Sequence, residues 1–116
     1  MKITSYGFGN IHIDNKKFTS DLKIIRGRIK PDWWRRAGHR LEKEDILDII
    51  EANPRILIVG TGYSGLMRVA EGLAEEMERL GISMQAMPSK NAVAKFNELV
   101  EKHGADDVAF AIHLTC

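Results

Sequence analysis

Residues 55–65 read RILIVGTGYSG, and this stretch decides the fold class. Residues 55–59 form a short segment that is rich in β-branched residues and apolar on both faces, which predicts a strand buried between two layers. Residues 60–65 then match the pattern G-x-G-x-x-G, which is typical of a tight turn between a strand and a helix. A buried strand that leads through such a turn into a helix predicts an α/β domain with a parallel or mixed sheet.

The rest of the chain towards the C-terminus continues this alternation. Apolar residues at intervals of three and four predict a helix over residues 66–80, and residues 82–87 predict a second strand. Ser89 is expected to cap a third helix, which Gly104 ends. Residues 108–112 are apolar throughout and predict a last, central strand.

The first part of the chain has a different character. Residues 1–40 lack helical periodicity and contain alternating polar and apolar runs, so they predict β-hairpins or a meander. Residues 43–52 carry one apolar helical stripe, which Asn53-Pro54 stops. At 116 residues, the chain is expected to fold as one domain, with the β-α-β-α-β unit over residues 55–115.

Composition excludes several classes of protein. Hydrophobic residues make up 44% and charged residues 28%, and no apolar run is long enough to cross a membrane. The single cysteine, Cys116, rules out an internal disulfide and a multi-cysteine metal site. With no secretion signal at its start, the sequence predicts a soluble cytoplasmic protein that does not contact a membrane.

Charge is distributed unevenly along the chain. The first 43 residues carry 11 Lys and Arg against 4 Asp and Glu, whereas the remaining residues carry 6 against 12. The two blocks can neutralise each other in the folded domain, or the basic block can present a face to an anionic partner. We favour neutralisation, because a nucleic-acid-binding domain is more often basic throughout.

The glycine-rich residues 60–65 form the first candidate site. Unpaired amides at the start of a helix attract a phosphate or carboxylate, so a small anionic ligand is one interpretation, and a plain structural turn is the other. A complete dinucleotide site is disfavoured, because residues 84–88, where a ribose-binding Asp or Glu would lie, read MQAMP.

If the last three strands are parallel, their carboxyl ends bring further polar residues to this loop. Ser89 could instead be only a helix cap and His113 only a core histidine, and His113 leaves the site if the last strand is antiparallel. The candidate ligand-binding residues are Gly60, Thr61, Gly62, Tyr63, Ser64, Gly65, Ser89, Lys90, Asn91 and His113.

A second candidate site combines aromatic rings with cations between residues 33 and 40. Neighbouring tryptophans in an extended segment point to opposite faces, so at least one of the two is expected to anchor the core. The exposed remainder suits a protein partner better than a nucleic acid. The candidate partner-binding residues are Trp33, Trp34, Arg35, Arg36, His39 and Arg40.

Catalytic and metal-binding patterns are not recognisable. The four histidines have no close metal-ligand spacing, and no residue set matches a known catalytic constellation. We therefore expect no metal, no cofactor and no catalytic residues.

Four segments together resemble one family of small domains. They are residues 58–63 (IVGTGY), residues 89–99 with Ala92 and Asn97, residues 34–39 (WRRAGH) and residues 111–113 (AIH). The resemblance covers essentially the whole chain. The family is a domain family of unknown function that includes the mitochondrial complex I assembly factor three and an adipogenesis-associated mammalian protein.

The resemblance implies a three-layer fold, in which helices flank a central mixed sheet and the N-terminal residues add a β layer. It implies no catalytic residues, and its assembly-factor member acts through protein contacts. We therefore expect a noncatalytic protein-binding or assembly-type module, either monomeric or homodimeric. A protein or enzyme that binds an anionic metabolite or nucleotide at residues 60–65 is the alternative.

Overall fold

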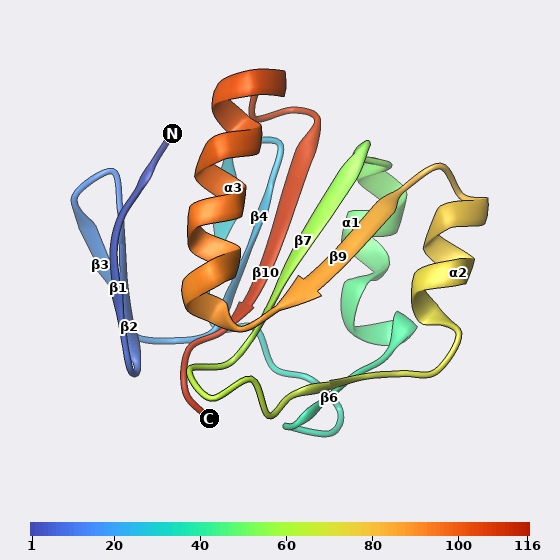
Figure 1. The fold of residues 1–116 in the computed structure, drawn as a ribbon, viewed down its shortest axis with the longest axis horizontal. Helices are drawn as coiled ribbons and strands as arrows, with labels where there is room; N and C mark the ends of the chain where they lie inside the picture. The colour runs from blue at the N-terminus through green and yellow to red at the C-terminus, as the bar shows by residue number, and fades with distance from the viewer.

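A five-stranded mixed sheet runs through the centre of the molecule, in a computed structural model that describes all of residues 1–116 (Figure 1). The strand order is β5-β4-β10-β7-β9. β10, β7 and β9 are parallel to one another, and β4 and β5 form an antiparallel hairpin beside β10. The strands span Leu22–Ile25 (β4), Arg28–Lys30 (β5), Ile56–Thr61 (β7), Ser83–Met87 (β9) and Val108–His113 (β10).

β10 is the central strand, and all of its side chains are buried. Phe110 and Ile112 belong to the core on one face of the sheet, whereas Ala109 and Ala111 belong to the core on the other. This two-sided burial explains the continuous apolar run in the sequence. The three strands predicted at residues 55–59, 82–87 and 108–112 are confirmed.

One face of the sheet is covered by the long helix α3 (Ser89–His103) and by a small antiparallel sheet. The rings of Phe96 on α3 and Phe110 on β10 lie 4.7 Å apart between their centroids. Asn97 joins the helix to the small sheet, because its side chain exchanges two 2.8 Å hydrogen bonds with the backbone of Ile3. The small sheet consists of β1 (Ile3–Gly7), β2 (Asn10–Ile13) and β3 (Lys16–Phe18).

The opposite face is covered by shorter helices. A 3-10 turn, η1 (Lys43–Ile46), continues into α1 (Leu47–Ala52), and α2 (Leu73–Arg79) follows later in the chain. The helix predicted over residues 43–52 is thus confirmed, with its first turn as 3-10 helix. Asn53 ends it in the left-handed conformation, at φ 50°.

The helix predicted to begin after Gly65 is wrong in its first half. Residues 66–70 are extended, and β8 (Arg68–Val69) pairs in parallel with β6 (Arg40–Leu41). The amides of Met67, Arg68 and Ala70 donate to Thr61, His39 and Leu41, so hydrogen bonds to distant segments replace those of a helix. Leu66, predicted on the buried stripe, is exposed.

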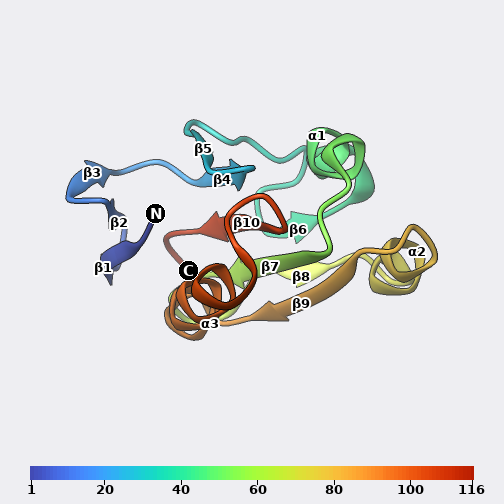
Figure 2. The same cartoon turned by 90° about the horizontal axis from the view of Figure 1, so that it is seen from above.

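The layers are clearest from above, where α1 and α3 lie on opposite sides of the central sheet and the small sheet lies at one end (Figure 2). The architecture is therefore the expected three-layer α/β fold, with a central mixed sheet, flanking helices and an additional N-terminal β layer. None of its helices combines the length and the apolar character that a membrane span requires.

Candidate functional site

The glycine-rich loop, residues 60–65, lies at the carboxyl end of β7, as predicted. Three of its backbone amides donate to acceptors within the protein. Gly62 N donates to Ser89 Oγ at 2.8 Å, and Tyr63 N donates to the Thr115 carbonyl at 2.9 Å. Gly65 N donates to the Gly62 carbonyl at 3.1 Å. The loop also opens no helix, so the geometry expected for an anion at a helix N-terminus is absent here.

Ser89 is fully buried and does not cap α3, whose N-cap residue is Pro88. Its hydroxyl accepts from Gly62 N and donates to the His113 carbonyl at 2.6 Å. It therefore ties the ends of β7, β10 and α3 together, which corrects the prediction of a simple helix cap. Lys90 and Asn91 are exposed, and neither forms a hydrogen bond with the loop.

The remaining loop residues differ in exposure. Thr61 is buried and Ser64 is exposed. Tyr63 is exposed, and its ring packs edge-on against Phe8 at 5.7 Å between centroids. Ligand binding by the loop stays a prediction, with the plain structural turn as its alternative.

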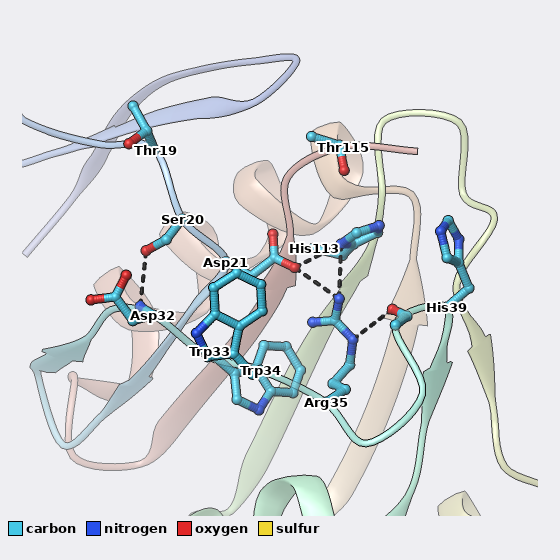
Figure 3. A pocket seen from close by; sticks show the side chains of 11 residues that line it. Thr19, Ser20, Asp21, Asp32, Trp33, Trp34, Arg35, His39, His113 and Thr115 are labelled. Carbon is cyan, nitrogen blue, oxygen red and sulfur yellow. Dashed lines mark hydrogen bonds and ion pairs between the residues drawn. The ribbon is translucent and has the colours of Figure 1, made fainter.

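His113 lies at the end of β10, in register with Thr61 of β7. The parallel arrangement that the ligand-site prediction required is therefore present. The imidazole, however, does not join the glycine loop. It contacts Asp21, which immediately precedes β4, and Arg35 from the segment between β5 and β6 (Figure 3).

Asp21 is the centre of this cluster. Its Oδ1 accepts from Leu114 N at 2.7 Å. Its Oδ2 lies 2.8 Å from Arg35 Nη2 and 2.7 Å from His113 Nδ1. A carboxylate oxygen only accepts, so the proton in the last contact is on Nδ1. Arg35 Nη2 and His113 Nδ1 also lie 3.0 Å apart. Both donate to the same oxygen, Oδ2 of Asp21, so they are neighbouring donors and not a donor and an acceptor.

The cluster holds Asp21 in its charged form. Burial raises the pKa of the Asp21 carboxyl. Hydrogen bonds from His113, the Leu114 amide and Arg35 lower this pKa, and their combined effect is larger than that of burial. The net result is a pKa below the usual value for aspartate.

Arg35 is held rigidly, and its side chain is 4% exposed. The guanidinium stacks on the Trp33 ring at 4.7 Å, and its Nε donates to the Gly38 carbonyl at 2.9 Å. Trp33 is itself anchored, because its Nε1 donates to the Asp45 carbonyl at 2.9 Å. Arg35 Nη1 and His113 Nε2 have no hydrogen-bond partner, although both are shielded from solvent.

A pocket of about 330 Å³ lies above this cluster (Figure 3). Trp34, which is 84% exposed, and His39 stand at its rim, and the His39 ring lies edge-on to His113 at 5.5 Å. The lining residues are Thr19, Ser20, Asp21, Asp32, Trp33, Trp34, Arg35, Gly38, His39, His113 and Thr115.

The structure therefore joins two sequence predictions that were separate. His113 comes from the predicted ligand site, whereas Trp33, Trp34, Arg35 and His39 come from the predicted partner site. The other two partner-site residues, Arg36 and Arg40, are exposed, and Arg40 pairs weakly with Glu42 at 3.6 Å.

Trp33 and Arg35 were predicted to contact a partner at the surface. In the structure both side chains are buried, since Trp33 is 6% exposed and Arg35 forms an ion pair with Asp21. Sequence reasoning missed Asp21 itself. Its one signal was its position as a rare acidic residue in the basic first 43 residues, just before a strand. No group of three His, Cys, Asp or Glu side chains has an arrangement that could hold a metal.

The fold defines the class of protein: a small α/β domain built on a five-stranded mixed sheet, with a polar pocket at the end of its central strand. A family model described as "Protein of unknown function (DUF498/DUF598)" matches residues 3–113. The chain therefore belongs to that family, and the resemblance found in the sequence to a domain family of unknown function is confirmed.

Solved structures share the fold over nearly the full chain. A conserved hypothetical protein, PH1505, from Pyrococcus horikoshii is 27% identical with a TM-score of 0.80, and the match covers 100% of both chains. A protein from Bartonella henselae, described as an outer membrane protein, is 26% identical with a TM-score of 0.80, and the match covers 98% of this chain and 94% of that one. MT938 is 22% identical with a TM-score of 0.79, and the match covers 99% of this chain and 98% of that one. At this identity the likeness is evidence for the fold only.

Proposed function

We propose that this chain is a noncatalytic binding module that holds a protein partner at Trp34. The observation that carries the proposal is the contrast between two neighbouring tryptophans. Trp33 is 6% exposed and anchored in the core, whereas Trp34 is 84% exposed at the rim of a pocket. An exposed tryptophan beside a pocket is typical of the residues that dominate the binding energy of protein interfaces.

Charge around Trp34 favours an acidic segment in the partner. The Arg36 side chain is exposed and forms no ion pair. Arg40 and Arg68 face each other in the parallel β6–β8 ladder, and both are exposed. Like charges in register repel each other, and Glu42, 3.6 Å from Arg40, offsets only one of the two, so an acidic partner segment would relieve the remaining repulsion.

The geometry around His113 supports a noncatalytic role. Its Nδ1 is committed to Asp21, and its Nε2 touches no hydroxyl or thiol that it could activate. The alternative function, binding of an anionic metabolite or nucleotide at residues 60–65, has less support, because the amides of Gly62, Tyr63 and Gly65 are already hydrogen-bonded. A cytoplasmic location and a monomeric or homodimeric state belong to the same proposal.

The test is selection of binders from a displayed library of random peptides, followed by affinity measurements on the enriched sequences. We expect acidic peptides with an apolar residue for Trp34. Trp34→Ala is expected to weaken their binding by about thirtyfold, the effect of removing an interface hot spot. Arg36→Glu should weaken it through charge repulsion, and neither change should alter the melting temperature.

The matched control is Leu47→Ala, which removes an exposed apolar side chain from α1. It should leave peptide binding unchanged. Peptides that bind equally well to Trp34→Ala and Arg36→Glu, or a library that yields no binder, would contradict the proposal.

A further inference from the structure

A second hollow lies beside the pocket of Trp34, and its volume is about 480 Å³. The two hollows meet at consecutive residues, because His39 lines the Trp34 pocket and Arg40 lines the second hollow. The amide of Arg68, which also lines the second hollow, donates to the His39 carbonyl at 2.8 Å and fixes this junction.

We propose that the partner segment bound at Trp34 continues into the second hollow, with an acidic side chain on Arg68 and an apolar side chain on Leu66. The inference rests on the proposed partner binding. It adds to that proposal a second anchor and a motif in the partner, which is an acidic residue two positions from an apolar residue.

Leu66 is an apolar side chain that the fold presents to solvent from a fixed backbone. It is 59% exposed and lines the second hollow. Its amide donates to the Cys116 carbonyl at 3.0 Å, and the amide of the next residue, Met67, donates to the Thr61 carbonyl at 2.9 Å. Because this backbone is already ordered, covering Leu66 costs little conformational entropy, and more of its apolar burial contributes to binding.

Residues 66–68 alternate in burial, as an extended segment does. Leu66 and Arg68 are exposed, whereas Met67 between them is 3% exposed and belongs to the core. Side chains two residues apart in an extended segment share one face and are separated by roughly 6.6 Å. An extended partner segment presents an apolar and an acidic side chain at the same spacing when they also lie two positions apart.

Arg68 supplies the preference for an acidic residue. It lies in register with Arg40 in the parallel β6–β8 ladder, and Glu42 lies 3.6 Å from Arg40. Arg68 itself forms no ion pair, and Glu71, which also lines the hollow, pairs with neither arginine. Arg68 is therefore the cation that is free to pair, and a guanidinium can bind a carboxylate through two parallel hydrogen bonds.

The combined surface favours a chain segment over a small molecule. The Trp34 pocket has a volume of about 330 Å³, and it is joined to the larger second hollow at His39 and Arg40. An occupant that contacts the exposed apolar side chains of both hollows, Trp34 and Leu66, must therefore be extended. A peptide meets this requirement with its backbone over the junction and its side chains in the two hollows.

The first test is a double-mutant cycle between the protein and a selected peptide that contains the motif. Leu66→Ala should weaken binding about fivefold, and replacing the apolar residue of the motif by Ala should have a similar effect. Once the peptide lacks this residue, Leu66→Ala should have no further effect, because the contact has already been removed. The melting temperature of the protein should not change, since Leu66 is exposed.

A second cycle tests the charge. Arg68→Gln should weaken binding about threefold at low salt and less at high salt, because exposed ion pairs are weak and are screened. The effect should vanish with a peptide whose acidic residue is changed to its amide. The matched controls are Leu80→Ala, at an exposed leucine after α2, and Arg28→Gln, at an exposed arginine of β5, and neither should alter binding.

The spacing of the motif gives a third test. One residue inserted between the acidic and the apolar position turns the apolar side chain to the opposite face of an extended peptide. The lengthened peptide should bind about as weakly as the original peptide binds to Leu66→Ala.

The outcomes separate this inference from the proposed function. Peptides that need Trp34 but are insensitive to Leu66→Ala and Arg68→Gln would overturn the inference and leave the proposed function standing. Sensitivity to these two changes without sensitivity to Trp34→Ala would support binding in the second hollow and contradict the proposed anchor at Trp34. Selected peptides that lack the motif, or that tolerate the inserted residue, would also overturn the inference.

Discussion

The glycine loop at residues 60–65 and the Asp21–Arg35–His113 cluster lie at the same end of the central sheet. They differ in whether their polar atoms have hydrogen-bond partners within the protein. In the loop, the amides of Gly62, Tyr63 and Gly65 all donate to protein acceptors. In the cluster, Arg35 Nη1 and His113 Nε2 are shielded and unpartnered.

The difference teaches which polar groups are available to a ligand. A motif that matches a ligand-binding pattern carries no binding potential once its donors are used internally. A buried donor that the fold leaves unpaired keeps that potential, because its pairing would recover the free energy lost on burial. In this chain three amides of the glycine loop are already hydrogen-bonded within the fold, so the cluster is favoured as the candidate for recognition.

The largest effect is expected for Gly62→Ala. Gly62 has φ 113°, and a Cβ there would lie 2.4 Å from the backbone carbon of Cys116 and 2.5 Å from the Thr115 carbonyl oxygen. Steric overlap and backbone strain should lower the free energy of unfolding by about 3–5 kcal/mol. Urea denaturation measures this change.

Gly72→Ala is the control, because Gly72 also has a positive φ, 81°, but no atom within 4 Å of a Cβ. It isolates backbone strain from the clash and should cost only about 1 kcal/mol. Equal losses for the two variants would show that the loop is not packed tightly against the C-terminal residues.

A smaller effect is expected for Asp21→Asn. The change removes the charge that accepts from Arg35, His113 and Leu114, and it should lower the free energy of unfolding by about 2–3 kcal/mol at neutral pH. Asp106→Asn, at an exposed aspartate without a polar partner, should change it by less than about 0.5 kcal/mol.

The same variant tests the pH dependence of stability. The pKa of Asp21 is lowered in the folded protein, relative to an unfolded value of about 3.9. Its stabilisation is therefore present above the unfolded pKa and is lost as the pH falls through the folded pKa. The difference in unfolding free energy between the native chain and Asp21→Asn should shrink in acid. A constant difference across this range would contradict the assigned hydrogen bonds.

The smallest effect on stability is expected for Ser89→Ala. The hydroxyl links Gly62 N to the His113 carbonyl, so its loss leaves a buried donor and a buried acceptor unpaired. We expect a loss of about 1–2 kcal/mol in the free energy of unfolding, measured by urea denaturation. Ser83→Ala, at an exposed serine, is the control and should be close to neutral. A neutral Ser89→Ala would show that water replaces the hydroxyl.

Much of the fold followed from local patterns. Residues 56–59 and 108–112 are apolar on both faces because each strand lies between two layers, and this pattern is visible in the sequence. The helix after Gly65 was predicted wrongly, because the helical spacing of its apolar residues was overridden by backbone pairing with residues 39–41. That pairing joins segments far apart in the chain, so no local pattern reveals it.

The candidate site was predictable only in pieces. Trp33, Trp34, Arg35 and His113 were all singled out by residue type, and the expectation that one tryptophan anchors the core is confirmed. Asp21, which organises the cluster, carried almost no signal, because an isolated aspartate before a strand has no motif.

The sequence by itself determined the buried strands, the long third helix and the presence of one core tryptophan, since these depend on the periodicity of neighbouring residues. Only the tertiary structure decided that three amides of the glycine loop are hydrogen-bonded within the protein, and that Asp21, Arg35 and His113 meet in one pocket. These outcomes depend on the order and direction of strands, which bring residues separated by about eighty or more positions within hydrogen-bond distance, as for Asp21 and His113 at a separation of 92.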